Sequence, residues 1–275
     1  DWSSDVCSSD LLLFANMGFT EMNSDRYFKM HYNLAGKALT QQIDVFAVDE
    51  ETIIFVECKA AKSLKDGNFK TDIESYAGTI PGLRVAALDR YPNRKVKFIF
   101  ATENYSLSQV DLDRLEEYQI THFSDEVISY YSELTKHLGT CARFQLLGNL
   151  FAGQKIKNMD SQIAAIQGKM GGHTYYSFSI EPERLLKVGY VLHRIEANRN
   201  LMPTYQRLIK RDRLTAVRKF INNKGYFPNS LVISIDTGGK ELQFDRSASQ
   251  VKDSIPRIGI LHLPQRYRSA YIIDG

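Results

Sequence analysis

Covalent cross-links and membrane anchors have little support in this sequence. The 275 residues include only three cysteines, Cys7, Cys58 and Cys141, which lie far apart and form no Cys-x-x-Cys pair. This spacing argues against a disulfide framework and a zinc knuckle, and a reducing cytosol fits it best. The longest apolar clusters end after about five residues, whereas a membrane-spanning helix needs roughly 18. We therefore expect a cytoplasmic protein with no membrane partner.

Charge of either sign is not in large excess. The chain has 35 Lys and Arg against 32 Asp and Glu, a formal net charge of +3, with 43% apolar and 24% charged residues. This balance is typical of a globular protein with one large or two ordinary domains, and it excludes disorder and a collagen-like structure. The net charge alone says little about partners.

Both ends of the chain are unusual. Residues 1–11 lack the basic start and apolar stretch of a signal peptide. Back-translated, they resemble one frame of a common sequencing adapter, so we interpret them as an artefactual leader; a genuine acidic leader is the alternative. Without them the chain has 35 basic and 29 acidic residues, a net charge of +6. Residues 269–275 suggest a strand entering a turn, and we expect the reading frame to be cut there too.

The pattern over residues 12–152 predicts one α/β domain. Residues 12–18 resemble the end of a helix, and 27–32 a strand. Two apolar runs, 43–48 and 53–59, are separated by a connection of hairpin length. A weaker helical pattern over 70–87 is broken at Pro81 and Gly82, and 96–101 is a buried strand. Residues 112–118 and 126–150 have helical spacing.

A second domain is expected after a linker. Residues 153–173 are polar and end in a glycine-rich turn, so we interpret them as the linker. Residues 174–275 predict strands over 174–180, 231–235 and 258–263, a basic helix that ends at Gly225, and the terminal strand. This alternation predicts an α+β domain.

Three charged residues interrupt the two apolar runs of the first domain. Asp44 lies in the run 43–48, and Glu57 and Lys59 share one face of the next. Charges in a strand that is apolar on both faces are costly unless they are paired or bind a metal. If the strands pair through their short connection, Asp44 and Glu57 lie at corresponding positions. Two carboxylates suit Mg²⁺, and Lys59 can orient or deprotonate an attacking water.

This arrangement resembles the PD-(D/E)XK nuclease superfamily, with an overall cast like that of Mrr-type restriction nucleases. The resemblance implies a mixed sheet flanked by helices, with Asp44 and Glu57 as metal ligands, Lys59 as the catalytic lysine and the Cys58 backbone carbonyl as a further ligand. Many members also carry a glutamate on the first helix, for which Glu21 is a poor candidate here. Glu74 and Tyr76 are weaker accessory candidates on the following helix.

A basic segment dominates the second domain. Residues 199–224 contain eight basic residues against one acid, Asp212. Leu214, Val217 and Ile221 form an apolar stripe, which leaves the bases on outer faces where they could neutralise phosphates. A solvated basic face without a ligand is the alternative.

Residues 163–275 resemble the DGQHR-domain family, which includes DndB-like proteins of DNA modification systems and looks distantly ParB-like. Residues 205–207, 211–213, 227–235 and 271–275 carry the resemblance. It implies that Arg207, Arg211 and Arg213 contact phosphate. Asp274 and Gly275 match the first two letters of the name motif, and the remaining three are absent, so this domain is expected to be incomplete.

Together these patterns predict a Mg²⁺-dependent DNA endonuclease of a restriction or modification-linked defence system. The expected partner is DNA, with a nucleotide, a second copy of the chain or DNA-modification proteins as further options. Two alternatives stay open. The protein could be a non-catalytic DNA-binding regulator, or a nucleotide hydrolase that acts through a complete DGQHR domain.

Overall fold

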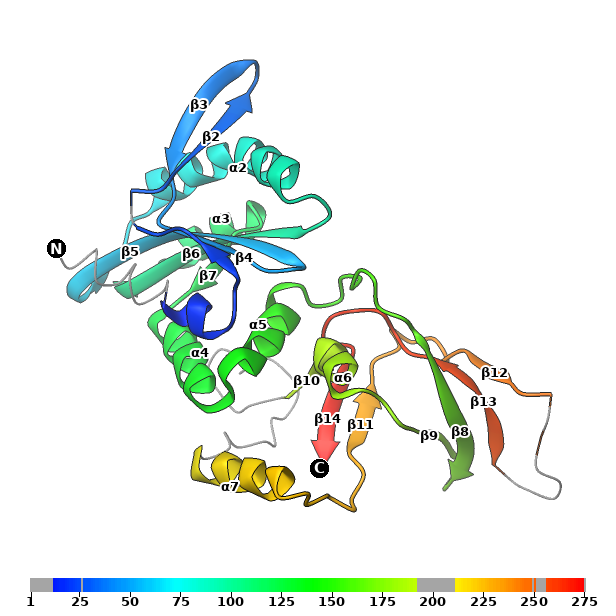
Figure 1. The fold of residues 1–275 in the computed structure, drawn as a ribbon. Coiled ribbons are helices and arrows are strands. Elements are labelled where there is room, and N and C mark those ends of the chain that lie inside the picture. Colours follow the sequence, from blue (N-terminus) through cyan, green and yellow to red (C-terminus); the bar gives the residue numbers. More distant parts are fainter. Residues whose placement is uncertain (1–11, 26, 192–210, 249, 251–255, 275) are drawn as a thin grey trace. The chain divides into compact units, whose positions relative to one another are not determined.

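The computed structural model describes residues 12–25, 27–191, 211–248, 250 and 256–274. These residues form two compact units, the first of residues 12–143 and the second of the described residues from 144 onward. Each unit has sheets and helices of its own (Figure 1). The expected α/β class, with a mixed sheet flanked by helices, is confirmed.

A five-stranded mixed sheet forms the centre of the first unit. Its strands follow the order β1 (Glu21–Met22), β4 (Val45–Val48), β5 (Thr52–Asp66), β6 (Lys95–Ser106) and β7 (Thr121–Phe123). β4 is antiparallel to β5, β6 is parallel to β5, and β7 is parallel to β6. β5 is therefore a central strand, as its two apolar faces predict.

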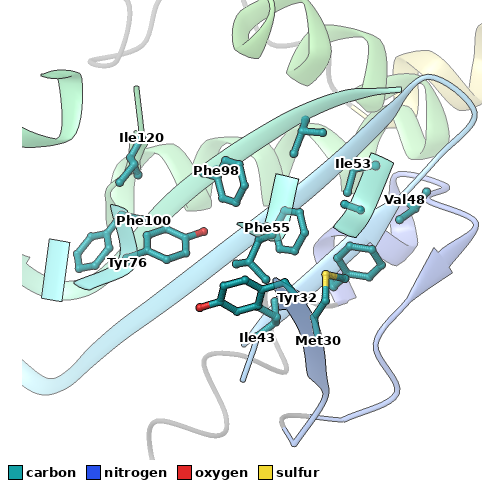
Figure 2. Packing of buried hydrophobic residues seen from close by; sticks show 14 of the residues in the cluster. Met30, Tyr32, Ile43, Val48, Ile53, Phe55, Tyr76, Phe98, Phe100 and Ile120 are labelled. Carbon is teal, nitrogen blue, oxygen red and sulfur yellow. The ribbon is translucent and has the colours of Figure 1, made fainter. Parts of the chain in front are cut away.

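Helices cover both faces of this sheet. α2 (Lys70–Arg90) and α3 (Gln109–Glu117) pack on one face, where Phe55 and Phe98 stack at 4.9 Å between ring centroids within the core shown in Figure 2. α4 (Asp125–Leu138) packs on the other face through Tyr131, which stacks on Phe123 at 5.8 Å. Because side chains alternate along a strand, the two helical layers contact different residues of the same strands.

α2 differs from its expected form. The helix runs for 21 residues through Pro81 and Gly82, so the expected break there is wrong. A proline inside a helix costs about 3 kcal/mol, but burial of Ile73, Leu83 and Ala87 against the sheet supports α2 on both sides of the proline. Tertiary packing therefore outweighs the local preference to end the helix.

A β-hairpin is inserted between β1 and β4. It consists of β2 (Lys29–Leu34) and β3 (Lys37–Gln42), joined by Ala35 and Gly36, both with positive φ, as a type I′ turn requires. β2 agrees with the expected strand over 27–32, whereas β3 was not expected. The hairpin packs on α2 where Tyr32 approaches Gly82.

The helix expected over 126–150 is divided. α4 ends at Leu138, and Gly139 adopts a φ of +57°. A short 3₁₀ helix, η1 (Gly139–Cys141), and α5 (Ala142–Leu150) follow. Glycine accepts this left-handed conformation without a steric cost, which allows the chain to change direction there.

The second unit contains two sheets. β12 (Phe244–Arg246), β13 (Arg257–His262), β8 (Gln162–Met170) and β9 (His173–Phe178) form an antiparallel sheet in that order. β10 (Gly189–Tyr190), β14 (Ala270–Asp274) and β11 (Val232–Ile235) form a smaller mixed one. Two helices, α6 (Pro182–Val188) and α7 (Arg211–Asn222), complete the described elements.

The expected linker over 153–173 is corrected by β8. Ile163 and Ala165 alternate with exposed neighbours and bury against Leu261 and Leu263. Residues 162–170 are therefore a strand inside a sheet, and their polar composition reflects one solvent-facing side. Within the described residues, no helix has the length and apolar character needed to cross a membrane.

Candidate active site

The turn between β4 and β5 sets the register of the candidate site. Oδ1 of Asp49 accepts hydrogen bonds from the backbone N–H groups of Glu51 (2.8 Å) and Thr52 (2.6 Å) and from the Thr52 hydroxyl (2.9 Å). Asp49 and Thr52 are both buried. The ladder then runs from Val48 opposite Ile53 to Val45 opposite Val56. Continued by one pair, this register places Asp44 opposite Glu57, in agreement with the sequence prediction.

Asp44 is held by backbone contacts on both sides. Its Oδ2 accepts a hydrogen bond from the Cys58 N–H at 2.9 Å. The buried side chain of Asn23 donates to the Asp44 carbonyl at 3.0 Å and accepts from the Phe46 N–H at 2.8 Å. The carboxylate of Asp44 is therefore oriented from β5, and its backbone is fixed by the residue that follows β1.

The two carboxylates share a partly buried environment. Burial raises the pKa of Asp44 above its ordinary value, although the Cys58 N–H and the Lys59 charge oppose this. The pKa of Glu57 is also raised, first by burial and then by the negative charge of Asp44, while Lys59 opposes the shift. Two carboxylates that repel each other in this way favour a shared cation.

Lys59 forms ion pairs with a carboxylate of its own strand, β5, and with one of α2. Its Nζ lies 3.1 Å from Oε1 of Glu57 and 2.8 Å from Oδ1 of Asp72. Burial lowers the pKa of Lys59, but the hydrogen bonds and charges of Asp72 and Glu57 outweigh it and raise the pKa above its ordinary value. Lys59 is therefore an ammonium ion at neutral pH. It can orient a water molecule by donating hydrogen bonds, but in this state it cannot act as a general base.

α2 contributes two residues on one helical face. Asp72 lies in the first turn, and Tyr76 lies one turn later. Tyr76 is buried, and its pKa is raised by burial and by the charges of Glu57, Cys58 and Asp44, which places the phenol beside the cluster. Glu74 is exposed. Sequence reasoning considered Tyr76 and Glu74 but missed Asp72, although the i, i+4 spacing from Tyr76 could have identified it.

The donor set fits a hard cation with an incomplete protein shell. Among the described residues, no group of three or more His, Cys, Asp and Glu side chains could hold a metal ion. Mg²⁺ typically binds through one or two carboxylates and completes its shell with water and phosphate oxygens. Because the N–H and C=O of one strand residue point to the same edge, the Cys58 carbonyl faces the side on which Asp44 lies. Asp44, Glu57 and this carbonyl could therefore hold Mg²⁺.

A second polar pair continues along the sheet. Thr102 on β6 is the register partner of Lys59, and its hydroxyl lies 2.9 Å from Nε2 of His122 on β7. Burial lowers the pKa of His122 to about 4, against the opposing charge of Asp125. The imidazole is neutral at physiological pH. The sequence did not indicate His122 as a site residue, because only the pairing of β7 with β6 brings it next to Thr102.

The remaining predicted residues lie apart from this cluster or cannot be placed. Glu21 pairs with Val48 at the opposite end of β4 and contacts Tyr91, so it does not join Asp44. Arg213 is exposed on α7. Arg207 and Gly275 lie outside the described residues. The side chains of Arg211, at the start of α7, and Asp274, at the end of β14, are likewise outside the described part of the chain.

Comparisons with known proteins give no assignment. No protein-family model matches the sequence, and no curated protein matches it significantly. A structural similarity exists to the crystal structure of protein VC1899 from Vibrio cholerae, with 16% sequence identity and a TM-score of 0.32. The match covers 48% of this chain and 31% of that one. A likeness at this level defines neither the fold family nor the function, and the site must be judged by its own geometry.

Proposed function

We propose that the first unit is a Mg²⁺-dependent DNA endonuclease module of the PD-(D/E)XK type. The observation that carries the proposal is the placement of Asp44 opposite Glu57, with Lys59 on the same face of a central strand. The succession of an antiparallel strand pair, α2 and the parallel strand β6 supports it, because this is the order that the resemblance implies.

The chain's own residues would act on a DNA phosphodiester as follows. Asp44 and Glu57 would hold the cation, and its chemistry there would be to acidify a water ligand and to neutralise phosphate charge. Lys59 donates hydrogen bonds that orient the attacking water. Its positive charge offsets the negative charge of the phosphate. Asp72 holds the ammonium group of Lys59 in place. Water would add to phosphorus and lose a proton to solvent, while the P–O bond to one sugar oxygen breaks and that oxygen takes up a proton from solvent, which gives a phosphomonoester and a sugar hydroxyl.

For the second unit we propose a DGQHR-like domain that contributes DNA contacts. The exposed position of Arg213 on the basic helix α7 supports a phosphate-facing surface. Together the two units would serve a cytoplasmic restriction or modification-linked defence system.

A non-catalytic DNA-binding platform is the second candidate function. One observation favours it: Lys59 already pairs with both Glu57 and Asp72. This internal cation compensates part of the negative charge of the cluster, as in a purely structural ion-pair network. In that case the fold would bind DNA and recruit a modifying machine without cleaving it.

Plasmid nicking with Mg²⁺ separates these functions. The variants are Glu57→Gln and Lys59→Met, which keep side-chain size, with Glu74→Gln on the exposed side of α2 as a matched carboxylate control. We expect both site variants to slow nicking by at least about 100-fold, a typical loss for a positioned catalytic group, and the control to retain activity. Equal nicking by all four proteins contradicts the metal-site assignment. DNA binding without nicking by the wild type supports the platform.

A further inference from the structure

A projecting β-ribbon immediately precedes the candidate site in the chain. We define the ribbon as β2, β3 and their connecting turn, with cross-strand pairs from Lys29 opposite Gln42 to Leu34 opposite Lys37. In Figure 1 the ribbon extends beyond α2 on the outside of the first unit. Its base lies two residues before Asp44, so the chain leads directly from the ribbon into the carboxylate pair.

The two faces of the ribbon have different surroundings. Met30 and Tyr32 point inward and belong to the buried core against α2 (Figure 2). The outward face is exposed and carries Lys29, His31, Asn33, Ala38, Thr40 and Gln42. Five of these six side chains can donate or accept hydrogen bonds. Packing through the inner face thus fixes the ribbon while leaving a polar surface exposed.

The charge of the ribbon suits a polyanion. Residues 27–43 contain two lysines, Lys29 and Lys37, and no aspartate or glutamate, whereas the chain as a whole has nearly equal numbers of basic and acidic residues. Both lysines are exposed: Lys29 lies on the outward face, and Lys37 lies beside the turn on the inner face, opposite Leu34. An acid-free ribbon whose outward face bears an exposed ammonium group can approach phosphates without like-charge repulsion.

We propose that the outward face of this ribbon enters the major groove of the DNA held at the candidate active site. This inference rests on the proposed nuclease function. The major groove admits a two-stranded β-ribbon, and Asn, Lys and Thr side chains recognise adenine, guanine and the thymine methyl group there. Six residues at roughly 3.3 Å each span about 20 Å, or about six base pairs. The ribbon therefore reads base pairs within about six positions of the cleaved phosphodiester, on one side of it.

Salt-dependent DNA binding by the full chain tests the electrostatic part. Affinity for a random-sequence duplex is measured by fluorescence anisotropy without Mg²⁺, from low to moderate salt. Lys29→Gln, on the outward face, should reduce the slope of log Kd against log salt by about 0.9, the value for one lost phosphate contact, whereas Lys37→Gln, on the inner face, should reduce it less. Lys136→Gln, at an exposed lysine of α4 on the other face of the sheet, should leave the slope unchanged. An unchanged slope for Lys29→Gln overturns the proposal.

Mapping of nick positions tests the base-reading part. Plasmid nicked by the wild type and by His31→Ala/Asn33→Ala is sequenced at the new ends. Among the nicks that each protein makes, we expect an altered base preference within about six positions on one side of the nick. Identical preferences overturn groove reading and leave the nuclease function standing. A wild type that does not nick contradicts the nuclease function, while the salt slopes still decide whether the ribbon binds DNA. A change in oligomeric state with unchanged slopes shows that the ribbon contacts protein, which also overturns the proposal.

Discussion

Alanine substitution at Gly82 should destabilise the first unit even though alanine is the better helix former. A Cβ built at Gly82 would lie 2.1 Å from Cδ2 and 2.6 Å from Cε2 of Tyr32. The Tyr32 ring is buried within the core and anchors the ribbon on α2, so it must move. Overpacking of this kind costs about 1–3 kcal/mol, and the gain in helix propensity is about 1 kcal/mol. The net loss should be about 1 kcal/mol.

Gly78 provides a matched control in the same helix. It is exposed, and a Cβ there would meet nothing within 4 Å. Gly78→Ala should therefore stabilise the unit by up to about 1 kcal/mol through helix propensity alone. Two substitutions of the same kind, one turn apart, are thus expected to have opposite signs. The difference between them measures the contact of Tyr32 with α2.

The assay is a urea titration of the full chain, followed by hydrogen exchange in peptides from α2. A local readout is needed because a chain with two units does not necessarily unfold in a single two-state transition. The decisive measurement adds Tyr32→Ala. In that background the clash is removed, so Gly82→Ala should now stabilise by about 1 kcal/mol. Stabilisation by Gly82→Ala in the wild-type background, or the same destabilisation with and without the Tyr32 ring, would refute the reasoning.

Three further predictions concern the site. Asp49→Ala removes three hydrogen bonds at the buried turn and should cost about 2–4 kcal/mol in a urea titration, whereas the exposed Glu50→Ala should cost under about 0.5. Because the folded-state pKa of Glu57 is raised, the folded state keeps a proton that the unfolded state has lost, and stability falls as pH rises through that window. Glu57→Gln should flatten this part of the pH profile, and parallel profiles contradict the assignment. Asp72→Asn should slow nicking about 10-fold, as loss of a supporting contact does, with DNA affinity unchanged; unaltered nicking removes Asp72 from the site.

The sequence predicted the central elements of the first unit because their signals are local. The apolar runs that became β4 and β5, the short connection at Asp49 and the alternation of Glu57 and Lys59 are all readable over a few residues. The continuous α2 was missed, since propensity at Pro81 points the other way and only burial of Leu83 and Ala87 against the sheet overrides it. β8 was mistaken for a linker because its exposed side is polar and a glycine-rich turn follows it; its partner β9 comes directly after that turn, but the strand β13, against which Ile163 and Ala165 bury, lies far along the chain.

The sequence by itself determined that Asp44 and Glu57 face each other and that Lys59 shares their side. Strand periodicity and a short turn are sufficient for that, and both are properties of neighbouring residues. Only the tertiary structure decided that Asn23 fixes the backbone of Asp44 and that Asp72 binds Lys59. These partners come from separate elements, whose distances depend on how α2 and β1 pack on the sheet. A lysine is an ammonium ion at neutral pH in any case, and the same packing raises the pKa of Lys59 further, because the contacts with Asp72 and Glu57 outweigh the cost of burial.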